Sequence, residues 1–436
     1  MRRVAVVGSG ISGLSVAHAL RSQARVTLFE AGAHFGGHAN TVDVTLDGVT
    51  HGVDTGFLVL NERTYPNLLR LFEQLGVPIA KSDMSFSVRA PDIDLEWSGS
   101  DLNTVFAQRR NLLRPAFWRM LADVLRFNRV ATALALAGDA GALDQPIGEF
   151  LDAQRFGPQF RDWYFLPMIG CIWSCPTDQM LRFPVATMIR FCHNHGLIQV
   201  ANRPQWYTVR SGARTYVRKM LEAVPDARLN TPVRSVRRPR RGDADPCVLV
   251  STDAGTERFD ELVLACHSDQ SLALLSDPSA AETALLGAIG YHRNRALLHT
   301  DTSVLPKRRL AWAAWNYERA ALESREHAGV CLHYWLNRLQ PLPFTTPVIV
   351  SLNPVTEPRA DTIHGEFDYA HPVFDAAAIA AQRRVPQLQG ERHTWYCGAW
   401  TRYGFHEDGL MSGLAVCEGL RSRWATEPAA PVLEAA

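Results

Sequence analysis

Apolar runs alternate with glycine turns along the first part of the chain. Residues 4–7 form an apolar, mostly β-branched run, a glycine-rich turn follows over 8–13, and an apolar stretch with helical character covers 14–20. A second predicted strand, over 25–29, ends on Glu30. Short apolar runs bounded by turns are typical of strands that are buried on both faces. The pattern therefore predicts a strand–turn–helix–strand unit with parallel strands.

The next segments predict a β-hairpin and then a helix. Polar and apolar residues alternate over 41–46, a turn dipeptide stands at 47–48, and the chain returns over 49–53. The stretch 65–75 has helical periodicity and stops at Gly76, a residue type that accepts the left-handed conformation found at helix ends.

Residues 61–200 read as a mainly helical insertion, in which one helix is predicted from about residue 100 through Leu136. Aromatic strand patterns over 310–317 and 332–337 predict an antiparallel sheet. Further strands are predicted over 229–236, 247–252 and 259–265, with helices over 215–223 and from about Gly409 onward. The fold class is α/β: a Rossmann-like domain (1–60, 205–275, 391–424), a second α+β domain with the helical insertion and the antiparallel sheet (61–204, 276–390), and a disordered tail (425–436).

Composition limits the classes of function. The 436 residues are 47% hydrophobic and 20% charged, which is typical of a globular chain long enough for two domains. A net charge of +1 and the absence of a nucleic-acid-binding motif give no argument for nucleic acid as a partner. Because no run of 18 apolar residues occurs, no membrane-spanning segment is expected.

The cysteine and histidine spacings do not predict a metal site. The close pair Cys171 and Cys175 has no second pair to complete a zinc site, and His193 and His195 are two positions apart and would not share a helix face. We expect the eight cysteines to be reduced thiols in a cytoplasmic protein. Residues 1–3 and the apolar run resemble a signal peptide, but the strand–turn–helix unit already explains that run, so export is not expected.

The glycine-rich turn has the spacing of a dinucleotide-binding loop, Gly8-Ser9-Gly10-Ile11-Ser12-Gly13. In such a loop the first glycine makes the turn, the second admits a pyrophosphate, and the third lets the helix pack on the strand. The N–H groups at the start of the helix favour phosphate. Glu30, followed by Ala31, can accept both hydroxyls of the adenosine ribose, and its charge would repel a 2′-phosphate. The unit therefore predicts FAD or NAD rather than NADP.

A second glycine pair follows this acid: Gly36 and Gly37, and then His38. The arrangement resembles the extended FAD signature of the flavin-containing amine oxidase and phytoene desaturase superfamily, in which arginine usually stands at the position of His38. The resemblance covers nearly the whole chain. It implies FAD as the cofactor and an FAD-binding Rossmann-like domain of the GR2 type.

The resemblance also implies further contacts with FAD. Gly56 and Phe57 would lie beside the flavin ring, and Val233 would hold the adenine through its backbone. The segment from Trp395 to Ala415 resembles the C-terminal flavin motif of the superfamily, and the positions that match contacts in this motif are Gly398, Gly409, Leu410 and Met411. An acid usually follows the first glycine of this motif, and here Ala399 stands there. A helix start at this place can stabilise negative charge on the reduced flavin.

No residue stands out as an obligatory general base. The sequence offers three candidates for polar contacts with substrate or flavin, which are His195 before the turn at Gly196, Lys307 and His406. For Lys307 the argument is the resemblance to amine oxidases that order water with a lysine near flavin N5. His406 begins the run 406–408, which occupies the place of an aromatic residue expected by the resemblance. This departure argues against simple amine oxidation.

Residues 109–129 carry six arginines and one acid, Asp123, interleaved with apolar side chains. A basic amphipathic helix of this kind can lie on an anionic membrane surface, or it can present a solvated arginine face above a domain core. The dense aromatic and aliphatic content of 162–216 is consistent with the wall of a large apolar cavity and equally with ordinary core.

Two stretches, 167–174 and 194–197, resemble bacterial predicted NAD/FAD-binding proteins whose genes often neighbour cyclopropane fatty acid synthases. Together these features predict an FAD-dependent oxidoreductase that transfers hydride between a substrate C–H bond and flavin N5, with a lipid-like acyl chain as substrate. The alternatives are an amine oxidase that releases peroxide and a non-catalytic FAD-binding partner of a lipid-modifying enzyme. The sequence does not indicate the electron acceptor or the oligomeric state.

Overall fold

The computed structural model of the chain describes residues 1–137, 145–173, 176–199, 203–239, 243, 246–320 and 330–426. The chain forms two compact units, each assembled from separate segments. The first unit consists of Met1–Ala39, Tyr216–Ile289 and Ala378–Ala436, and the second of Asn40–Thr215 and Gly290–Ala377. Residues 138–144, the cysteine at 175 and residues 427–436 of the predicted tail lie outside the described residues. The first two residues of the predicted tail, Ala425 and Thr426, are the last residues of the C-terminal helix and not disordered.

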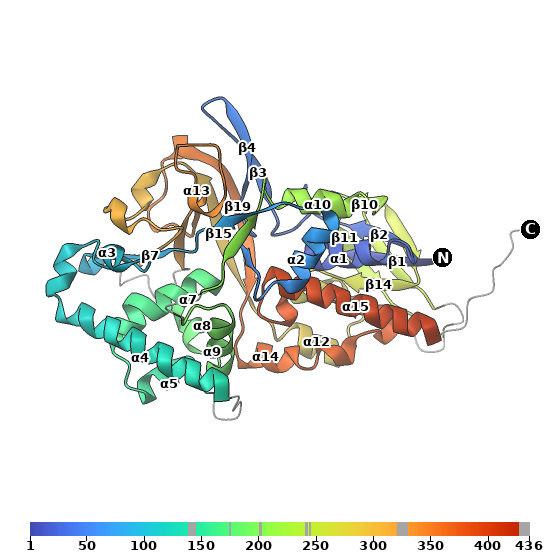
Figure 1. Ribbon diagram of the computed structural model, residues 1–436. Helices are drawn as coiled ribbons and strands as arrows, with labels where there is room; N and C mark the ends of the chain where they lie inside the picture. The colour runs from blue at the N-terminus through green and yellow to red at the C-terminus, as the bar shows by residue number, and fades with distance from the viewer. Residues whose placement is uncertain are drawn as a thin grey trace, which may run out of the picture. The chain divides into compact units, whose positions relative to one another are not determined.

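The first unit is built on a five-stranded parallel sheet, shown with its helices in Figure 1. The strand order is β10 (Asp226–Arg228), β2 (Ala24–Phe29), β1 (Arg2–Val7), β14 (Glu261–Leu264) and β20 (Thr394–Tyr396). The central residues Val4, Ala5 and Val6 are fully buried, because helices cover both faces of a sheet of this kind. The predicted strand–turn–helix–strand unit is therefore confirmed.

Helices and a small antiparallel sheet complete the first unit. The helices are α1 (Ile11–Leu20), α10 (Arg214–Leu221), α11 (Ser268–Leu274), α12 (Ala280–Leu286), α14 (Ala376–Gln382) and α15 (His406–Thr426), of which α10 and α14 begin in the second unit. The antiparallel strands are β11 (Val233–Arg237), β12 (Val248–Thr252) and β13 (Gly255–Phe259). Helix α15 packs against α1, although the two are at opposite ends of the chain.

The second unit contains a seven-stranded mixed sheet. Its order is β19 (Ile363–Pro372), β15 (Tyr291–His299), β18 (Ile349–Leu352), β17 (Cys331–Trp335), β16 (Trp315–Glu318), β7 (Phe86–Ala90) and β8 (Leu95–Ser98). All neighbouring strands are antiparallel except β16 and β7. Two smaller sheets pair β3 (Thr41–Leu46) with β4 (Val49–Asp54), and join β5 (Leu60–Asn61), β9 (Trp206–Val209) and β6 (Ile79–Ser82). The predicted hairpin and antiparallel sheet are confirmed.

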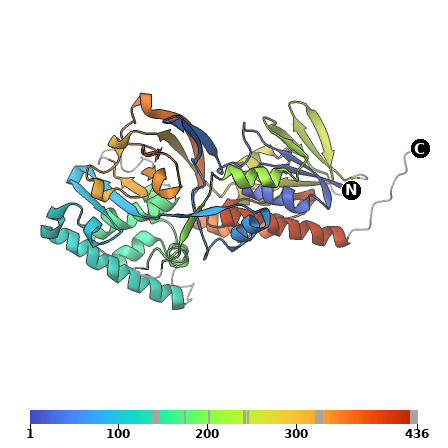
Figure 2. The ribbon, with the colours of Figure 1, turned by 45° about the horizontal axis from the view of Figure 1, so that its top comes forward.

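The helical part of the second unit follows β5 and β8 along the chain (Figure 2). It contains α2 (Pro66–Leu75), α3 (Leu102–Val105), a 3-10 turn η2 (Arg109–Leu113), α4 (Pro115–Ala137), α5 (Ile147–Ala153), α6 (Pro158–Phe160), α7 (Leu166–Trp173), α8 (Thr177–Leu181) and α9 (Val185–Asn194). The single helix predicted from residue 100 to 136 is wrong, because Pro115 lacks an N–H donor and starts a new helix instead of continuing one.

The observed units differ from the predicted limits in four segments. Residues 276–289 and 378–390 group with the first unit rather than with the second. Residues 40–60 and 205–215 group with the second unit rather than with the first. The reason is the buried carboxylate of Asp54, which accepts hydrogen bonds from Thr41 Oγ1 at 2.5 Å, Ala213 N at 2.9 Å and Gln340 Nε2 at 2.7 Å. These bonds fasten the end of β4 to two other segments of the same unit.

Candidate functional site

The glycine loop of the first unit joins the end of β1 to the start of α1. Gly8 has φ +101°, a conformation that side chains rarely adopt, and its N–H donates to Phe29 O of the neighbouring strand at 2.9 Å. A Cβ atom at Gly13 would collide with the carbonyl oxygen of Gly8, so the helix can approach the strand this closely only with glycine. The loop thus has the geometry predicted for Gly8 and Gly13.

The start of α1 is suited to a phosphate group. Its first residues Ile11, Ser12 and Gly13 are buried, and the N-cap Gly10 provides no side-chain cap for their N–H groups. A Cβ atom at Gly10 would meet nothing within 4 Å, so there is open space next to the loop backbone. Uncapped N–H groups beside such a space favour an anionic ligand. The residues present therefore fit the pyrophosphate of a dinucleotide.

Glu30 lies against the glycine loop. Its Oε2 accepts from Ser9 N at 3.0 Å and from Ser9 Oγ at 2.5 Å, and its Oε1 accepts from Gly32 N at 2.8 Å. A carboxylate has about four acceptor sites, so one stays available for a ribose hydroxyl while the protein holds the group in place. This arrangement fits the role predicted for Glu30, and it adds Ser9 as a positioning residue for which the sequence gave no specific role.

The second glycine pair packs on the first loop. Gly36 N donates to both Ser9 O and Ser9 Oγ at 3.1 Å, and a Cβ atom at Gly37 would come within 3.3 Å of Gly10 Cα. The loop from Ala31 to His38 is therefore part of the same cradle. The His38 ring lies 6.2 Å from the ring of His267, a residue that the motifs did not identify.

The start of α15 meets the start of α1 in the same unit. A Cβ atom at Gly409 would lie 2.7 Å from Ile11 Cγ2 and 3.0 Å from Ser12 Oγ. At Gly413 a Cβ atom would lie 2.5 Å from Ser12 O. The N-terminal and C-terminal motifs, which are separated by almost the whole chain, thus form one site. Helix α15 begins at His406, three residues before the predicted start, so Gly409, Leu410 and Met411 lie inside its first two turns.

Gly398 lies in the connection between β20 and α15. Its N–H donates to Ser412 Oγ at 2.9 Å, and Trp400 Nε1 donates to Cys266 O at 3.1 Å. A Cβ atom at Gly398 would collide with the Trp400 ring. Ser412 and Trp400 therefore fix the loop of the C-terminal motif, and neither was identified as a site residue from the sequence.

His406 is the candidate catalytic residue within the first unit. Its Nε2 lies 2.6 Å from the hydroxyl of Tyr216, and loss of hydration lowers the pKa of His406 to about 3. The ring is therefore neutral at pH 7 and can exchange a hydrogen bond with Tyr216 without carrying charge. Next to it, burial raises the pKa of Asp408 to about 6 even though Asp408 Oδ2 accepts from Phe405 N at 3.0 Å.

The remaining predicted residues are distributed over both units. Val233 is the first residue of β11 in the first unit and is buried. Gly56 and Phe57 follow β4 in the second unit and are half-buried. In the same unit the Lys307 side chain is exposed, while its backbone N–H donates to Glu96 Oε1 at 2.8 Å.

His195, in the second unit, is the C-cap of α9 and is buried. Because the carbonyl of Phe191 can only accept, His195 Nδ1 donates to it at 3.0 Å. The imidazole stacks on the Phe191 ring at a centroid distance of 3.9 Å, and burial lowers its pKa to about 4. Gly196 has φ +68°, which confirms the predicted turn. These contacts give His195 a part in the local packing.

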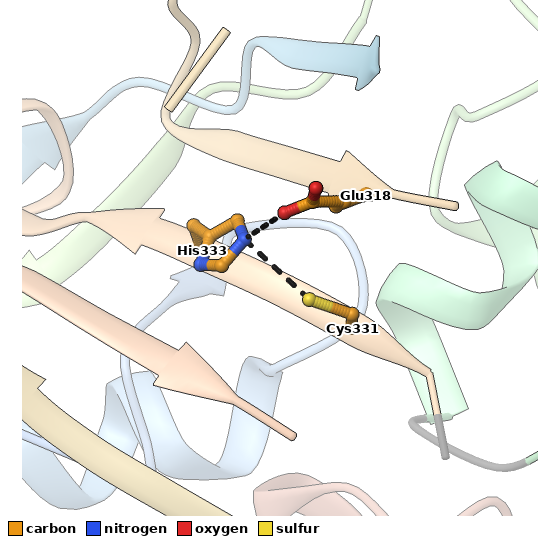
Figure 3. A group of neighbouring side chains, drawn as sticks. All are labelled: Glu318, Cys331 and His333. Carbon is orange, nitrogen blue, oxygen red and sulfur yellow. Dashed lines mark hydrogen bonds and ion pairs between the residues drawn. The ribbon is translucent and has the colours of Figure 1, made fainter. Parts of the chain in front are cut away.

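A buried cluster of Glu318, Cys331 and His333 occupies one face of the seven-stranded sheet (Figure 3). His333 Nε2 lies 3.1 Å from Glu318 Oε2 and 3.4 Å from Cys331 Sγ. The sequence did not indicate this grouping, because the residues come from two strands. Glu318 Oε1 also lies 3.6 Å from the guanidinium of Arg89, so positive charge already compensates this carboxylate. We assign no metal to the cluster.

The cluster continues as a directed chain of hydrogen bonds. Asp301 N–H donates to His299 Nδ1 at 3.1 Å, so His299 Nε2 is the donor to Ser351 Oγ at 2.7 Å. The Ser351 hydroxyl then donates to His333 Nδ1 at 2.6 Å, and His333 Nε2 donates to Glu318. Burial lowers the pKa of His299 to about 4, which keeps this ring neutral. Every member of the chain therefore has a partner, which a buried polar network requires.

Comparison with known proteins agrees with this description. Residues 6–75 match the family described as NAD(P)-binding Rossmann-like domain. Protoporphyrinogen oxidase 2 of Arabidopsis thaliana is 27% identical over 193 residues, which is 41% of this chain and 34% of that protein. The match therefore spans about a third of the length of this relative.

Two solved structures share the fold over almost the whole chain. A fatty acid isomerase from P. acnes that produces CLA superposes with a TM-score of 0.67 at 15% identity, over 97% of this chain and 98% of that one. Cyclohexylamine oxidase from Brevibacterium oxydans superposes with a TM-score of 0.64 at 16% identity, over 96% and 99%. The chain thus has a Rossmann-type dinucleotide-binding domain, and it shares its overall fold with this isomerase and this oxidase.

Proposed function

We propose that the chain is an FAD-dependent oxidoreductase. The proposal rests on the contact between the N-terminal ends of α1 and α15 in the first unit. The start of α1 has no side-chain cap, Gly409 of α15 packs against it, and the glycine loop before α1 holds Glu30. A plain NAD site needs only the first loop, whereas the packing of Gly37 on Gly10 and of Gly409 on Ile11 builds a longer cradle. A longer cradle suits a cofactor with a second ring system.

Each part of the cradle has a role in binding. The first turn of α1 would hold the pyrophosphate, Glu30 would accept from the adenosine ribose, and Val233 would hold the adenine through its backbone. The first turns of α15, with Leu410 and Met411, would lie at the flavin end. Bound FAD would supply the acceptor or donor of a hydride at N5 of its ring.

The proposed substrate is an apolar, lipid-like acyl chain. The proposal is supported by the apolar content of the helical part of the second unit and by the likeness in fold to a fatty acid isomerase. The narrower resemblance to bacterial proteins encoded beside cyclopropane fatty acid synthases points to the same substrate class. A cytoplasmic protein that reaches its substrate at a membrane surface would be consistent with these features.

Amine oxidation is the second candidate, because cyclohexylamine oxidase has the same fold. Against it stands the run His406-Glu407-Asp408, in which an aromatic side chain would be expected. In this chain His406 is bonded to Tyr216, and Glu407 and Asp408 are buried. The run supplies no phenylalanine, tyrosine or tryptophan ring to face a substrate amine. A non-catalytic FAD-binding partner subunit is the third candidate.

The test is an anaerobic titration of the purified full chain with candidate substrates, in which the visible spectrum is recorded after each addition. We expect an oxidised flavin spectrum that bleaches on addition of bacterial phospholipid and does not change with a panel of polyamines and aromatic amines. Bleaching by amines would favour amine oxidation, and a flavin that no lipid or amine bleaches would favour the non-catalytic alternative. A colourless protein that cannot be reconstituted with FAD would contradict the whole proposal.

Glu30→Gln and Glu261→Gln give a matched pair for the binding step. Glu30→Gln removes the charge of the carboxylate that accepts from Ser9, so we expect the FAD content to fall at least ten-fold. Glu261→Gln alters a buried acid of the same unit at the start of β14, away from the glycine loop and from the first turn of α15, and the FAD content should change less. Equal losses in both variants would show that folding, and not the ribose contact, controls FAD content.

A further inference from the structure

Exposed apolar side chains are concentrated in one segment of the second unit. Leu113 is 87% exposed and Leu125 58%, and Leu112 and Trp118 are about half exposed. All four lie between η2 and the middle of α4, and Trp118 and Leu125 are seven positions apart, which puts them on one face of the helix. Large apolar side chains gathered on one exposed face mark an interaction site.

The main packing face of α4 lies on its other side, although Trp118 Nε1 also donates to Leu112 O at 2.9 Å and the Trp118 ring lies 5.3 Å from that of Phe106. The opposite face of α4 carries Phe117, Met120 and Phe127, which are fully buried, and the Phe127 ring packs on Phe160 and Phe165 at centroid distances of 5.3 and 5.2 Å. The helix is therefore apolar on two sides, and the apolar side chains of the second side remain about half exposed or more. A helix that is apolar all round is normally covered on all sides.

The charges of the same face are positive. Arg119 and Arg129 are exposed beside Trp118 and Leu125. The one acid of α4, Asp123, is turned away, because it accepts from Arg126 at 2.8 Å and from Gly157 N at 3.0 Å. We define the α4 surface by Leu112, Leu113, Trp118, Arg119, Leu125 and Arg129.

We infer that the α4 surface docks on an anionic lipid bilayer. Apolar side chains would enter the interface, and the arginines would contact lipid phosphates. A second copy of the chain is a poorer occupant, because a two-fold contact would bring Arg119 and Arg129 of both copies together. The groove beside Leu113 and Trp118 is shallow and open, so it does not enclose a small ligand.

The geometry specifies a helix that lies on the membrane. In the part of the chain that the structure describes, no helix has the length and hydropathy to cross a bilayer. The inner face of α4 is also occupied by its own unit, so this helix cannot be surrounded by lipid. Figure 2 shows α4 along the lower edge of the helical group of this unit, and the side chains of its outer face are exposed.

Co-sedimentation of the full chain with vesicles tests the inference. We expect binding to vesicles of phosphatidylcholine with phosphatidylglycerol at low ionic strength, and at least ten-fold weaker binding to phosphatidylcholine alone. The double variant Leu113→Glu/Trp118→Glu should lose at least ten-fold in affinity. Arg119→Gln and Arg129→Gln should each lose roughly five-fold on anionic vesicles, with a smaller effect of salt on what remains.

Val49→Glu is the matched control, since Val49 is 46% exposed on the β3–β4 hairpin and should bind like the wild type. Unchanged thermal unfolding of every variant shows that folding is intact. Hydrogen exchange adds a positional readout, in which anionic vesicles should slow exchange within 109–129. These assays measure docking and require neither flavin reduction nor turnover. Their outcome is therefore independent of the proposed oxidoreductase activity.

Three results would overturn the inference. One is binding that the double variant leaves unchanged, and a second is equal binding to neutral and anionic vesicles. The third is a concentration-dependent dimer in light scattering that Leu113→Glu/Trp118→Glu abolishes, together with no vesicle binding by the wild type. That result would assign the α4 surface to self-association.

Discussion

Helices α4 and α15 are the two longest helices among the described residues, with 23 and 21 residues, and they use their surfaces in opposite ways. Helix α15 packs through glycines on α1 and exposes Glu418, Arg421 and Ser422. Helix α4 packs through phenylalanines and exposes Trp118 and Leu125. One helix has a single buried face and a polar exterior, whereas the other is apolar inside and outside.

The difference between the two helices distinguishes surfaces that stabilise the fold from a surface that is available for docking. The inner faces of both helices stabilise their own units, and the exterior of α15 only needs to be compatible with water. The apolar side chains on the exterior of α4 contribute less to their unit, because about half or more of their surface stays in water. Substitutions on the two helices should therefore have very different costs, and the following predictions are arranged from the largest expected effect to the smallest.

Gly413→Val should give the largest loss. A Cβ atom at this position would lie 2.5 Å from Ser12 O and would collide with Ser15 Oγ, so α15 would have to move away from α1. We expect a loss of about 3 kcal/mol or more in the free energy of unfolding, together with loss of bound FAD. Ala415→Val is the control on the exposed side of the same helix and should cost about 0.5 kcal/mol. Chemical denaturation measures both, and similar costs would contradict the packing argument.

Two leucine-to-alanine substitutions test the comparison with the same change in side chain. Leu420 of α15 is fully buried, so Leu420→Ala should cost about 2–5 kcal/mol. Leu125 of α4 is 58% exposed, so Leu125→Ala should change stability by less than about 0.5 kcal/mol. Denaturant unfolding of the two variants gives the difference. A cost above about 2 kcal/mol for Leu125→Ala would mean that the outer face of α4 is covered within the molecule.

The structure could be predicted from the sequence where it depends on residues that are close together along the chain. The glycine loop, the hairpin at 41–53 and the helix ending at Gly76, where φ is +59°, each depend on residues within a few positions of one another. The sequence also placed Glu30 correctly at the end of β2 beside the loop. In these cases turn chemistry and hydrophobic period point to the same conformation.

Residues that meet across long distances could not be assigned from the sequence. Nothing near Gly413 indicates that it faces Ser12, and nothing near Glu318 indicates that His333 lies beside it. The sequence also did not determine which face of α4 is buried, because a helix with apolar residues on both sides shows no single apolar face in its periodicity. The start of α15 was placed three residues late, since the buried acids Glu407 and Asp408 read as loop residues.

Asp408 should make stability depend on pH. Burial raises the pKa of Asp408 to about 6 in the folded chain, above its ordinary value of 3.8, so the folded state binds a proton more tightly than the unfolded state. Protonation of Asp408 therefore contributes fully to the free energy of unfolding below about pH 4. The contribution is lost as the pH rises to about 6 and changes no further above that, and the total loss is on the order of 3 kcal/mol.

Asp408→Asn should flatten the pH dependence of stability between pH 4 and 6 and keep the hydrogen bond from Phe405 N. Glu418→Gln, an exposed change on the same helix, should leave the curve of the wild type. Unfolding midpoints measured at several pH values give the comparison. If the difference between wild type and Asp408→Asn were the same at pH 4 and pH 7, burial of this carboxyl would not be the cause.

Tyr216→Phe should have the smallest effect on α15, because it removes one hydrogen bond and no packing volume. The hydroxyl of Tyr216 lies 2.6 Å from His406 Nε2, and the ring of His406 has lost most of its hydration, so the cost should be about 1–2 kcal/mol. A double-mutant cycle with His406→Leu measures the pair, and we expect a coupling energy of about 1 kcal/mol. Additive effects would mean that the two side chains act independently. A coupling of the expected size would show that side chains of the first unit fix the start of α15, in contrast to α4, whose first residue is the exposed Pro115.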